Sequence, residues 1–234
     1  MIKLRLVIPQ AIKSLKLGKF VLIYDADGRE EEVDLVVGSQ FTTPSRIKMM
    51  RNDGGGLIFM MVHNSIARKL HLPYLSDVFY GAGNRYRVLR ELISHDIPYD
   101  KKSSFSITID HRKTFTGITD EDRAFTILEF AKLANELDPK IALRLFGERF
   151  RSPGSVPICI ASVESLQNRL GHTELSTALA DLAKITPVLT GCEMLNGSHQ
   201  ALPKGIAIEY AKKHNLVFLE GKDIVDAWFK KEPL

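Results

Sequence analysis

The sequence predicts a layered α/β architecture. Short apolar segments alternate with helical patterns over the whole chain, and no linker rich in Pro, Gly or Ser and no internal repeat interrupts them. With 44% hydrophobic side chains, 234 residues are enough to bury one sizeable core. Interleaved strands and helices indicate helices packed in layers against a sheet, although this pattern leaves the strand order open. We therefore expect residues 1–234 to form one domain.

Seven segments are typical of β-strands because they are short, mostly β-branched or aromatic, and bounded by Gly, Pro or Asp. They are residues 20–24, 33–37, 56–62, 104–110, 156–161, 188–191 and 216–219. In the segment 104–110 the apolar residues Phe105, Ile107 and Ile109 alternate with polar ones. This period of two predicts a strand with one buried and one solvated face.

Two helices are indicated by their start signals. Thr43 offers a capping oxygen before Pro44, a residue favoured at the first helical position. Thr119 precedes Asp120 at the start of a helical pattern that runs to about residue 137. Near the carboxyl end of the chain, Trp228 is expected to seat a last helix rather than to bind a ligand.

A further helix is predicted to begin near Thr173. Its apolar residues recur at three- and four-residue spacing, which indicates one packed side. On that pattern Glu174, Asp181 and Lys184 are expected to remain in solvent.

Charge and cysteine content exclude several classes of protein. Lys and Arg number 32 against 28 Asp and Glu, and a formal charge of +4 is too small to argue for nucleic acid as a partner. The two cysteines, Cys159 and Cys192, cannot form a disulfide framework or a four-thiolate zinc site. Free thiols suit a reducing cytosol. Because too few cysteines are present for a thiolate site, any metal is expected to bind oxygen and imidazole ligands.

No membrane or export segment is expected. Charged residues interrupt the start of the chain, which therefore lacks the apolar core of a signal peptide. The longest apolar stretch, residues 54–62, falls well short of the roughly 20 residues that cross a bilayer. These observations predict a cytoplasmic protein.

An acidic segment, residues 25–34, follows the first predicted strand through a turn at Gly28. If the segment is extended, Glu30, Glu32 and Asp34 share one face at spacings of roughly 7 Å. Carboxylates so placed repel one another unless a cation, an arginine or protonation offsets them, and Mg²⁺ prefers such oxygen ligands. The alternative is an exposed, solvated charged turn. Arg29 adds an anion-binding group beside this cluster.

The segment Arg169-Leu-Gly-His-Thr-Glu174 lies immediately before the strongest amphipathic helix. A helix N-terminus attracts anions, Arg169 can grip a phosphate, and His172 can bind a metal or transfer a proton. The alternative is that Thr173 is only a helix cap and His172 a surface histidine.

Two further motifs are weaker. Glu193 stands at the end of an apolar strand, where α/β folds tend to place ligand sites, although a lone glutamate there is more often solvated. The threonine-rich turn at residues 114–119 could contact phosphate or serve only as a helix cap.

Taken together and in this order, the four motifs resemble those of the 3,4-dihydroxy-2-butanone 4-phosphate synthase family, in particular its archaeal stand-alone forms. The resemblance covers nearly the whole chain and includes residues 96–107 and 113–120. It implies a single layered domain with a mixed β-sheet flanked by helices. It also implies a Mg²⁺-dependent lyase of riboflavin biosynthesis, with Mn²⁺ as an alternative ion. This lyase converts D-ribulose 5-phosphate into L-3,4-dihydroxybutan-2-one 4-phosphate and formate.

The resemblance also implies roles for individual residues. Glu30 and His172 match metal ligands, and Glu193, Glu32 and Thr116 match catalytic positions. A third set of residues matches substrate-binding positions, and Glu30 and His172 belong to this set as well. The set is Asp25, Arg29, Glu30, Asp34, Arg169, Leu170, Gly171, His172 and Thr173. The family forms homodimers with active sites at the subunit interface, so these groups are expected to come from both chains.

Two positions depart from the family pattern. Phe59 stands where relatives commonly carry a cysteine, and Ser155 stands where they commonly carry a histidine. Serine cannot titrate near neutrality, so we expect an altered proton relay. Two other readings follow: an inactive paralogue that binds sugar phosphate, and an RNA- or nucleotide-binding module of related fold.

Overall fold

The computed structural model describes residues 4–136, 138 and 140–230. Its seven strands form one mixed sheet in the order β4-β5-β3-β6-β2-β1-β7. The strands are β1 (Val21–Tyr24), β2 (Val33–Gly38), β3 (Phe59–Val62), β4 (Phe105–His111), β5 (Phe150–Ile160), β6 (Val188–Glu193) and β7 (Val217–Glu220). β1 pairs with β7, and β3 with β5, in parallel, while the other neighbours are antiparallel.

The helices are distributed along the whole chain. The α-helices are α1 (Leu4–Lys16), α2 (Pro44–Asp53), α3 (Asn64–Lys69), α4 (Leu75–Ala82), α5 (Arg87–Glu91), α6 (Asp120–Asn135), α7 (Ala142–Arg149), α8 (His172–Ala183), α9 (Lys204–Lys213) and α10 (Gly221–Phe229). Two 3₁₀ helices, η1 (Ser39–Phe41) and η2 (Ser165–Gln167), complete the set in the described residues. Among these residues, none of the helices is both long and apolar enough to cross a membrane.

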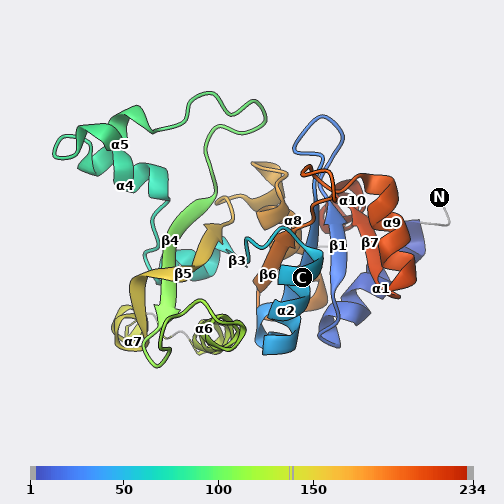
Figure 1. The fold of residues 1–234 in the computed structure, drawn as a ribbon, viewed down its shortest axis with the longest axis horizontal. Coiled ribbons are helices and arrows are strands. Elements are labelled where there is room, and N and C mark those ends of the chain that lie inside the picture. Colours follow the sequence, from blue (N-terminus) through green and yellow to red (C-terminus); the bar gives the residue numbers. More distant parts are fainter. Residues whose placement is uncertain (1–3, 137, 139, 231–234) are drawn as a thin grey trace.

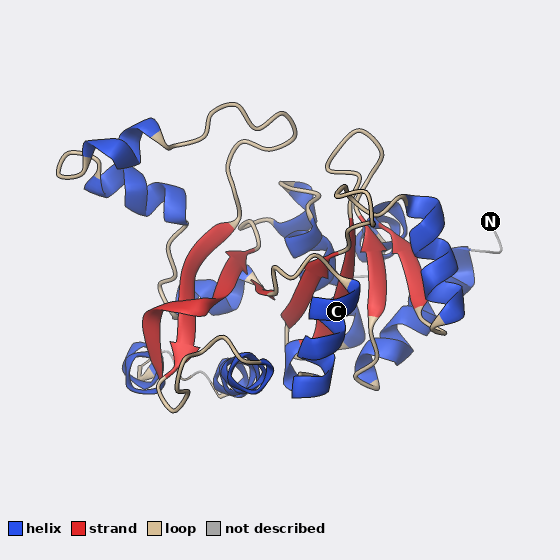
Figure 2. Cartoon of the chain, viewed as in Figure 1, coloured by secondary structure: helices blue, strands red, loops and turns tan. Residues whose placement is uncertain are grey.

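Helices cover both faces of the sheet, and each face has its own core (Figure 2). Helices α1, α8 and α10 pack on the face that carries Val21, Ile23 and Val36. Helices α2, α6, α7 and α9 cover the face that carries Leu22 and Leu35. Because both faces are buried, β2 is buried along its full length instead of alternating with solvent. The expected layers of a mixed sheet and helices are confirmed.

The strand predicted at residues 104–110 forms as β4, but its faces are not cleanly divided. Ser106 is buried and donates a hydrogen bond to the Pro73 carbonyl at 2.5 Å. Asp110 is also buried, and it accepts the backbone N–H of Ser155 at 2.8 Å. The expected alternation of buried and solvated residues was wrong here because hydrogen bonds satisfy the polar side chains inside the protein.

The start signals of two helices are confirmed. Thr43 caps α2 by accepting the N–H of Arg46, and Thr119 caps α6 by accepting the N–H of Asp122. Helix α6 ends at Asn135, and residue 137, the predicted end, lies outside the described residues.

Helices α4 and α5 form an arm that extends away from the sheet (Figure 1). The chain returns from this arm through residues 92–104 and enters β4. This returning segment contains no helix or strand. Several of its residues line the site described below.

Candidate active site

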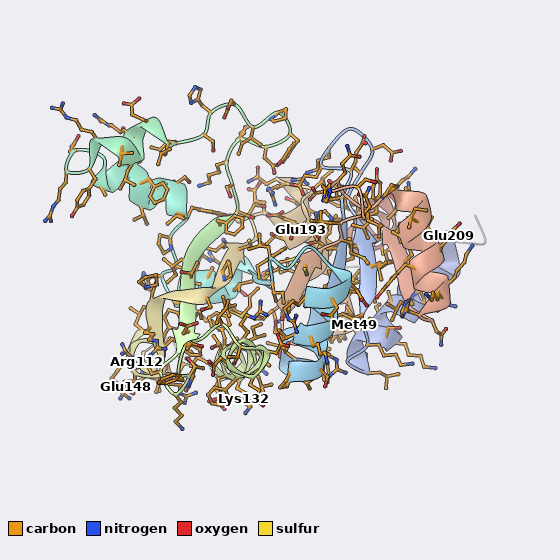
Figure 3. All side chains as sticks on the ribbon, in the orientation of Figure 1. Met49, Arg112, Lys132, Glu148, Glu193 and Glu209 are labelled. Carbon is orange, nitrogen blue, oxygen red and sulfur yellow. The ribbon has the colours of Figure 1, made fainter. Side chains whose placement is uncertain are left out.

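A cavity of about 200 Å³ lies where the ends of several strands meet the N-terminus of α8. Its lining comes from the β1–β2 turn, from strand ends, from the segment that returns from the arm, and from α8. The lining residues are Glu30, Glu32, Asp34, Phe59, Ile97, Tyr99, Asp100, Ser103, Ser104, Phe105, Cys159, Arg169, His172, Thr173 and Glu193. Figure 3 shows Glu193 in the middle of the molecule, whereas Arg112 and Glu148 lie far from it near α7.

Asp25 organises the turn between β1 and β2. Its buried carboxylate accepts the backbone N–H groups of Glu30 and Glu32 and pairs with Arg29 at 3.0 Å. The turn needs left-handed backbone at Gly28 (φ 78°) and at Glu31 (φ 58°). The predicted turn at Gly28 is therefore confirmed.

The three acidic side chains converge on the cavity, although not as one extended face. Glu30 and Glu32 stand in the turn before β2 begins at Val33, and only Asp34 lies within the strand. The segment does not take the extended form under which these side chains would share one face, because Asp25 folds the backbone around its own carboxylate. The shared location of Glu30, Glu32 and Asp34 is observed nevertheless.

Strand pairing sets Asp34 against Glu193. The two residues are direct partners in the antiparallel register of β2 and β6. Burial raises the pKa of Asp34 well above its usual range, and the charge of Glu193 adds to this shift. Burial likewise raises the pKa of Glu193, to which the charge of Glu32 contributes. Both oxygens of Asp34 lack a hydrogen-bond partner within the described residues.

His172 joins α8 to the acidic turn. Its Nδ1 lies 3.2 Å from Oε2 of Glu30, and its Nε2 lies 3.2 Å from the carbonyl oxygen of Glu32 and 3.8 Å from Asp34. Burial alone would lower the pKa of His172, but the charges of Asp34 and Glu30 raise it to about 9. Burial would raise the pKa of Glu30, but His172 and Arg29 hold it at about 2. The two side chains thus form an ion pair.

The N-terminus of α8 differs from the predicted cap. Gly171 is the N-cap residue, the helix begins at His172, and no side chain caps it. Thr173 is therefore not a helix cap. Its hydroxyl instead faces the cavity, 3.4 Å from Oγ of Ser104. A side chain at Gly171 would collide with the guanidinium group of Arg169, which folds back over this residue.

Glu174 is fully buried, so the prediction that it remains in solvent was wrong. Its carboxylate pairs with Nη1 of Arg169 at 2.6 Å and accepts the backbone N–H of Ser162 at 2.8 Å. The helical pattern gave no sign of these partners because both lie before the helix. The contacts explain why a charge can stay inside the protein.

One group of side chains fits a divalent cation. Single ligand atoms of Asp25, Glu30 and His172 lie within 4.8 Å of one another. Carboxylate oxygen and imidazole nitrogen suit Mg²⁺ or Mn²⁺. The carboxylate oxygens of Asp34, which lie near His172 without a hydrogen-bond partner, strengthen the fit, because buried polar atoms without partners are costly and a cation would supply one.

Not every predicted residue lies in this cavity. Leu170 is exposed and does not line it. Thr116 is exposed on the loop before α6, where its hydroxyl lies 3.3 Å from Asp122. Ser155 lies in β5 and donates its N–H to Asp110. Within one chain, therefore, the structure does not bring Thr116 or Ser155 to the other predicted residues.

The cavity also contains residues to which sequence reasoning assigned no role. Asp100 pairs with Arg29 and Arg169, and Tyr99 lies beside Arg29 with the guanidinium 5.2 Å from its ring centre. Cys159 reaches the cavity from β5, and burial raises the pKa of its thiol to about 12. Residues 96–107 resemble the family but show no chemical pattern of their own. This resemblance was the only signal in the sequence that pointed to Asp100.

Comparisons with known proteins agree on one family. The sequence profile of the 3,4-dihydroxy-2-butanone 4-phosphate synthase family matches residues 9–227. The 3,4-dihydroxy-2-butanone 4-phosphate synthase of Methanothermobacter thermautotrophicus is 43% identical over 226 residues, which are 96% of this chain and 97% of the relative. The synthase of Archaeoglobus fulgidus is 40% identical over 225 residues, which are 94% of this chain and 93% of the relative.

Solved structures show the same fold. A crystal structure of 3,4-dihydroxy-2-butanone 4-phosphate synthase in complex with two magnesium ions has a TM-score of 0.77 at 23% identity, and the match covers 97% of this chain and 98% of that one. The synthase of Candida albicans has a TM-score of 0.73 at 23% identity, with 94% and 96% covered.

Proposed function

The chain belongs to the 3,4-dihydroxy-2-butanone 4-phosphate synthase family, and we propose that it converts D-ribulose 5-phosphate into L-3,4-dihydroxybutan-2-one 4-phosphate and formate, a step of riboflavin biosynthesis. The observation that carries this proposal is the contact of Glu30 with His172 inside a cavity that also holds an arginine and four further carboxylates. Relatives named for this synthase match nearly the whole chain, and none of the comparisons favours an inactive paralogue or a nucleic-acid module.

Arg169 and Thr173 are suited to hold the phosphate end of the substrate. Arg169 presents its guanidinium group at the N-terminus of α8, where the first backbone N–H groups of the helix and its dipole favour an anion. Arg29 adds a second guanidinium group from the β1–β2 turn. Fixing the phosphate at this end would place the reacting carbons beside the acidic cluster.

Glu30 and His172, on geometry and donor type, would hold Mg²⁺, with Mn²⁺ as an alternative ion. A divalent cation supplies a positive charge that stabilises the enediolate formed when a proton leaves a carbon next to a ketone. Asp25 and Asp34 lie close enough to orient these ligands, Asp25 through the turn and Asp34 beside His172.

Glu32 and Glu193 are suited to move protons. Burial raises the pKa of both carboxyl groups, and the charge of Glu30 contributes in each case. A carboxylate with a raised pKa is a stronger base, and near neutral pH a larger fraction of the group carries the proton that a general acid donates. Both side chains line the cavity from separate elements, the acidic turn and the end of β6, so they can serve different carbons of the substrate.

We place Thr116 in the active site of a second chain within a homodimer. Thr116 is exposed, and beside it Phe115 is 92% and Ile118 58% exposed. Exposed apolar residues on a loop are typical of a surface that another protein covers. A partner chain would bring this loop, and Ser155 near it, to the cavity. We also place the enzyme in the cytoplasm, which suits its two free cysteines.

Formate release tests the proposed function. The purified chain, freed of metal with EDTA and supplied with D-ribulose 5-phosphate, is expected to release formate only after Mg²⁺ or Mn²⁺ is added. D-ribose 5-phosphate, an aldose without the ketone, serves as the control substrate and is expected to give none. A folded protein that releases no formate with either metal would exclude the proposed reaction.

A further inference from the structure

Asp100 occupies the anion-binding face of two arginines: Arg169, which lines the cavity, and Arg29, which lies on the β1–β2 turn. Its Oδ2 atom lies 2.5 Å from Nη2 of Arg29, and 3.0 and 2.6 Å from Nε and Nη2 of Arg169. One carboxylate oxygen thus accepts three N–H donors from two segments far apart in the sequence. All three side chains are largely buried, with Asp100 9% exposed.

The Nη1 groups of both arginines already have other partners. Nη1 of Arg169 is paired with Glu174 at 2.6 Å, and Nη1 of Arg29 is paired with Asp25 and Glu30. Glu174 and Asp25 are themselves buried and hold other backbone groups, so these pairs are part of the fold. Asp100 therefore takes donors from both arginines that an arriving anion would otherwise use.

Asp100 comes from the segment that returns from the arm. Ile97, Tyr99 and Ser103 of the same segment line the cavity, and Tyr99 lies beside Arg29. Within the described residues, Asp100 supplies the ion pairs between this segment and the two arginines. The carboxylate therefore also anchors this wall of the cavity.

We propose that Asp100 is a positioning residue that holds Arg29 and Arg169 in the ligand-free protein and is displaced by the phosphate group of the substrate. This inference rests on the proposed function for the identity of the ligand. A carboxylate and a phosphate offer guanidinium groups the same kind of oxygen acceptors, so they compete for one set of donors. Asp100 keeps two buried cations paired and thereby lowers the affinity for the anion.

Phosphate binding without turnover tests the exchange. Asp100→Asn removes the charge but keeps the size, and it is expected to lower the Kd of inorganic phosphate by about tenfold, measured by titration calorimetry on metal-free protein. Asp96→Asn, an exposed aspartate in the same segment, is the matched control and should leave the Kd unchanged. Unchanged or weaker phosphate binding by folded Asp100→Asn would overturn the proposal.

A second variant shows whether the gain uses the same donors. Arg169→Ala in the Asp100→Asn background is expected to abolish the gain in phosphate affinity. If the double variant binds phosphate as tightly as Asp100→Asn alone, the anion binds elsewhere and the proposal is wrong. In steady-state assays, the KM for D-ribulose 5-phosphate should fall in Asp100→Asn while kcat stays the same or falls. A purely structural role would not lower KM.

The wild-type protein provides a measurement that does not depend on a variant folding. Lys101 and Lys102 are exposed beside Asp100, and phosphate that displaces the carboxylate is expected to speed trypsin cleavage at these lysines. Slower or unchanged cleavage at saturating phosphate would overturn the displacement. If the wild type released no formate, the proposed function would be rejected. The phosphate-binding measurements would still test the displacement of Asp100, because they do not depend on turnover.

Discussion

Oε2 of Glu30 lies 3.2 Å from Nδ1 of His172, although 142 positions separate the two residues in the sequence. The turn around Asp25 places the glutamate, and the first residue of α8 places the histidine. Neither element alone supplies both side chains. The pair exists because α8 packs on the sheet face that β1 and β2 help to form.

Replacing Glu30 with Gln should abolish metal-dependent formate release and weaken Mn²⁺ binding by about 100-fold or more, because a charged oxygen ligand is lost. The Mn²⁺ affinity is measured by titration calorimetry. Glu31→Gln is the matched control, because Glu31 belongs to the same turn but is exposed. Near-wild-type rates in Glu30→Gln would remove this residue from the metal site.

The metal-free protein should lose stability as the pH rises from 6.5 to 9. The pKa of His172 rises from 6.5 in the unfolded chain to about 9 in the folded protein, so the folded state binds the proton more tightly across this window. The contribution of His172 to the free energy of unfolding is complete below pH 6.5 and is lost as the pH passes 9. The free energy of unfolding should therefore fall by about 3 kcal/mol over this window.

Urea unfolding in EDTA at about pH 6 and about pH 9.5 measures this change in the free energy of unfolding. His172→Gln should flatten the pH dependence, whereas His95→Gln, at an exposed histidine, should leave it as in the wild type. An equal slope in the wild type and in His172→Gln would contradict the assignment.

Gly171→Ala should raise the KM for D-ribulose 5-phosphate by about tenfold with a smaller effect on kcat, because the new methyl group displaces the guanidinium group of Arg169. Steady-state formate release measures both constants. The control is Gly147→Ala on α7, where a methyl group meets open space. It should leave KM unchanged and stabilise the helix by about 0.5–1 kcal/mol. An unchanged KM in Gly171→Ala would show that Arg169 does not bind the substrate.

Glu174→Ala should lower the free energy of unfolding by about 3 kcal/mol, because Arg169 loses a buried partner and the Ser162 N–H loses its acceptor. Glu148→Ala, which removes an exposed ion pair with Arg144, should cost less than about 1 kcal/mol. Both values are measured by urea unfolding. Equal losses in the two variants would mean that the buried pair does not stabilise the fold.

Two inactive variants should complement each other if the active site is shared between chains. Glu30→Gln and Thr116→Val are each expected to be inactive as homodimers. Random mixing of their subunits should restore about a quarter of the wild-type formate release, because half of the dimers are mixed and each mixed dimer has one intact site. Analytical ultracentrifugation verifies the dimer. Activity that stays at zero in verified mixed dimers would place Thr116 and Glu30 in the same chain's site.

All seven strands could be predicted from the sequence. Short β-branched segments between Gly, Pro and Asp are a local signal, and each predicted segment overlaps a strand. The caps at Thr43 and Thr119 were also predictable, because a capping oxygen and the N–H that it accepts lie within three residues. The strand order was not, because it depends on contacts between distant segments.

Other elements were missed because their signals are not local. Helix α1 contains Pro9, and α4 and α5 are short helices of an arm without buried side chains. Strand β5 begins at Phe150, six residues before the predicted start, because β4 supplies partners for Phe150 and Arg151 across a bulge. Pairing overrides the local preference of a Ser-Pro-Gly sequence in this strand.

The sequence by itself determined the chemistry of this protein: an acidic turn, an arginine and a histidine before a helix, a glutamate at a strand end, and no cysteine set for a metal. These are short-range patterns, and their order along the chain carries the resemblance to the family. Tertiary structure alone decided which groups meet. Register set Asp34 opposite Glu193, packing buried Glu174 against Arg169, and the returning segment carried Asp100 to both arginines. Such pairings depend on chain segments far apart in sequence, where local propensity carries no information.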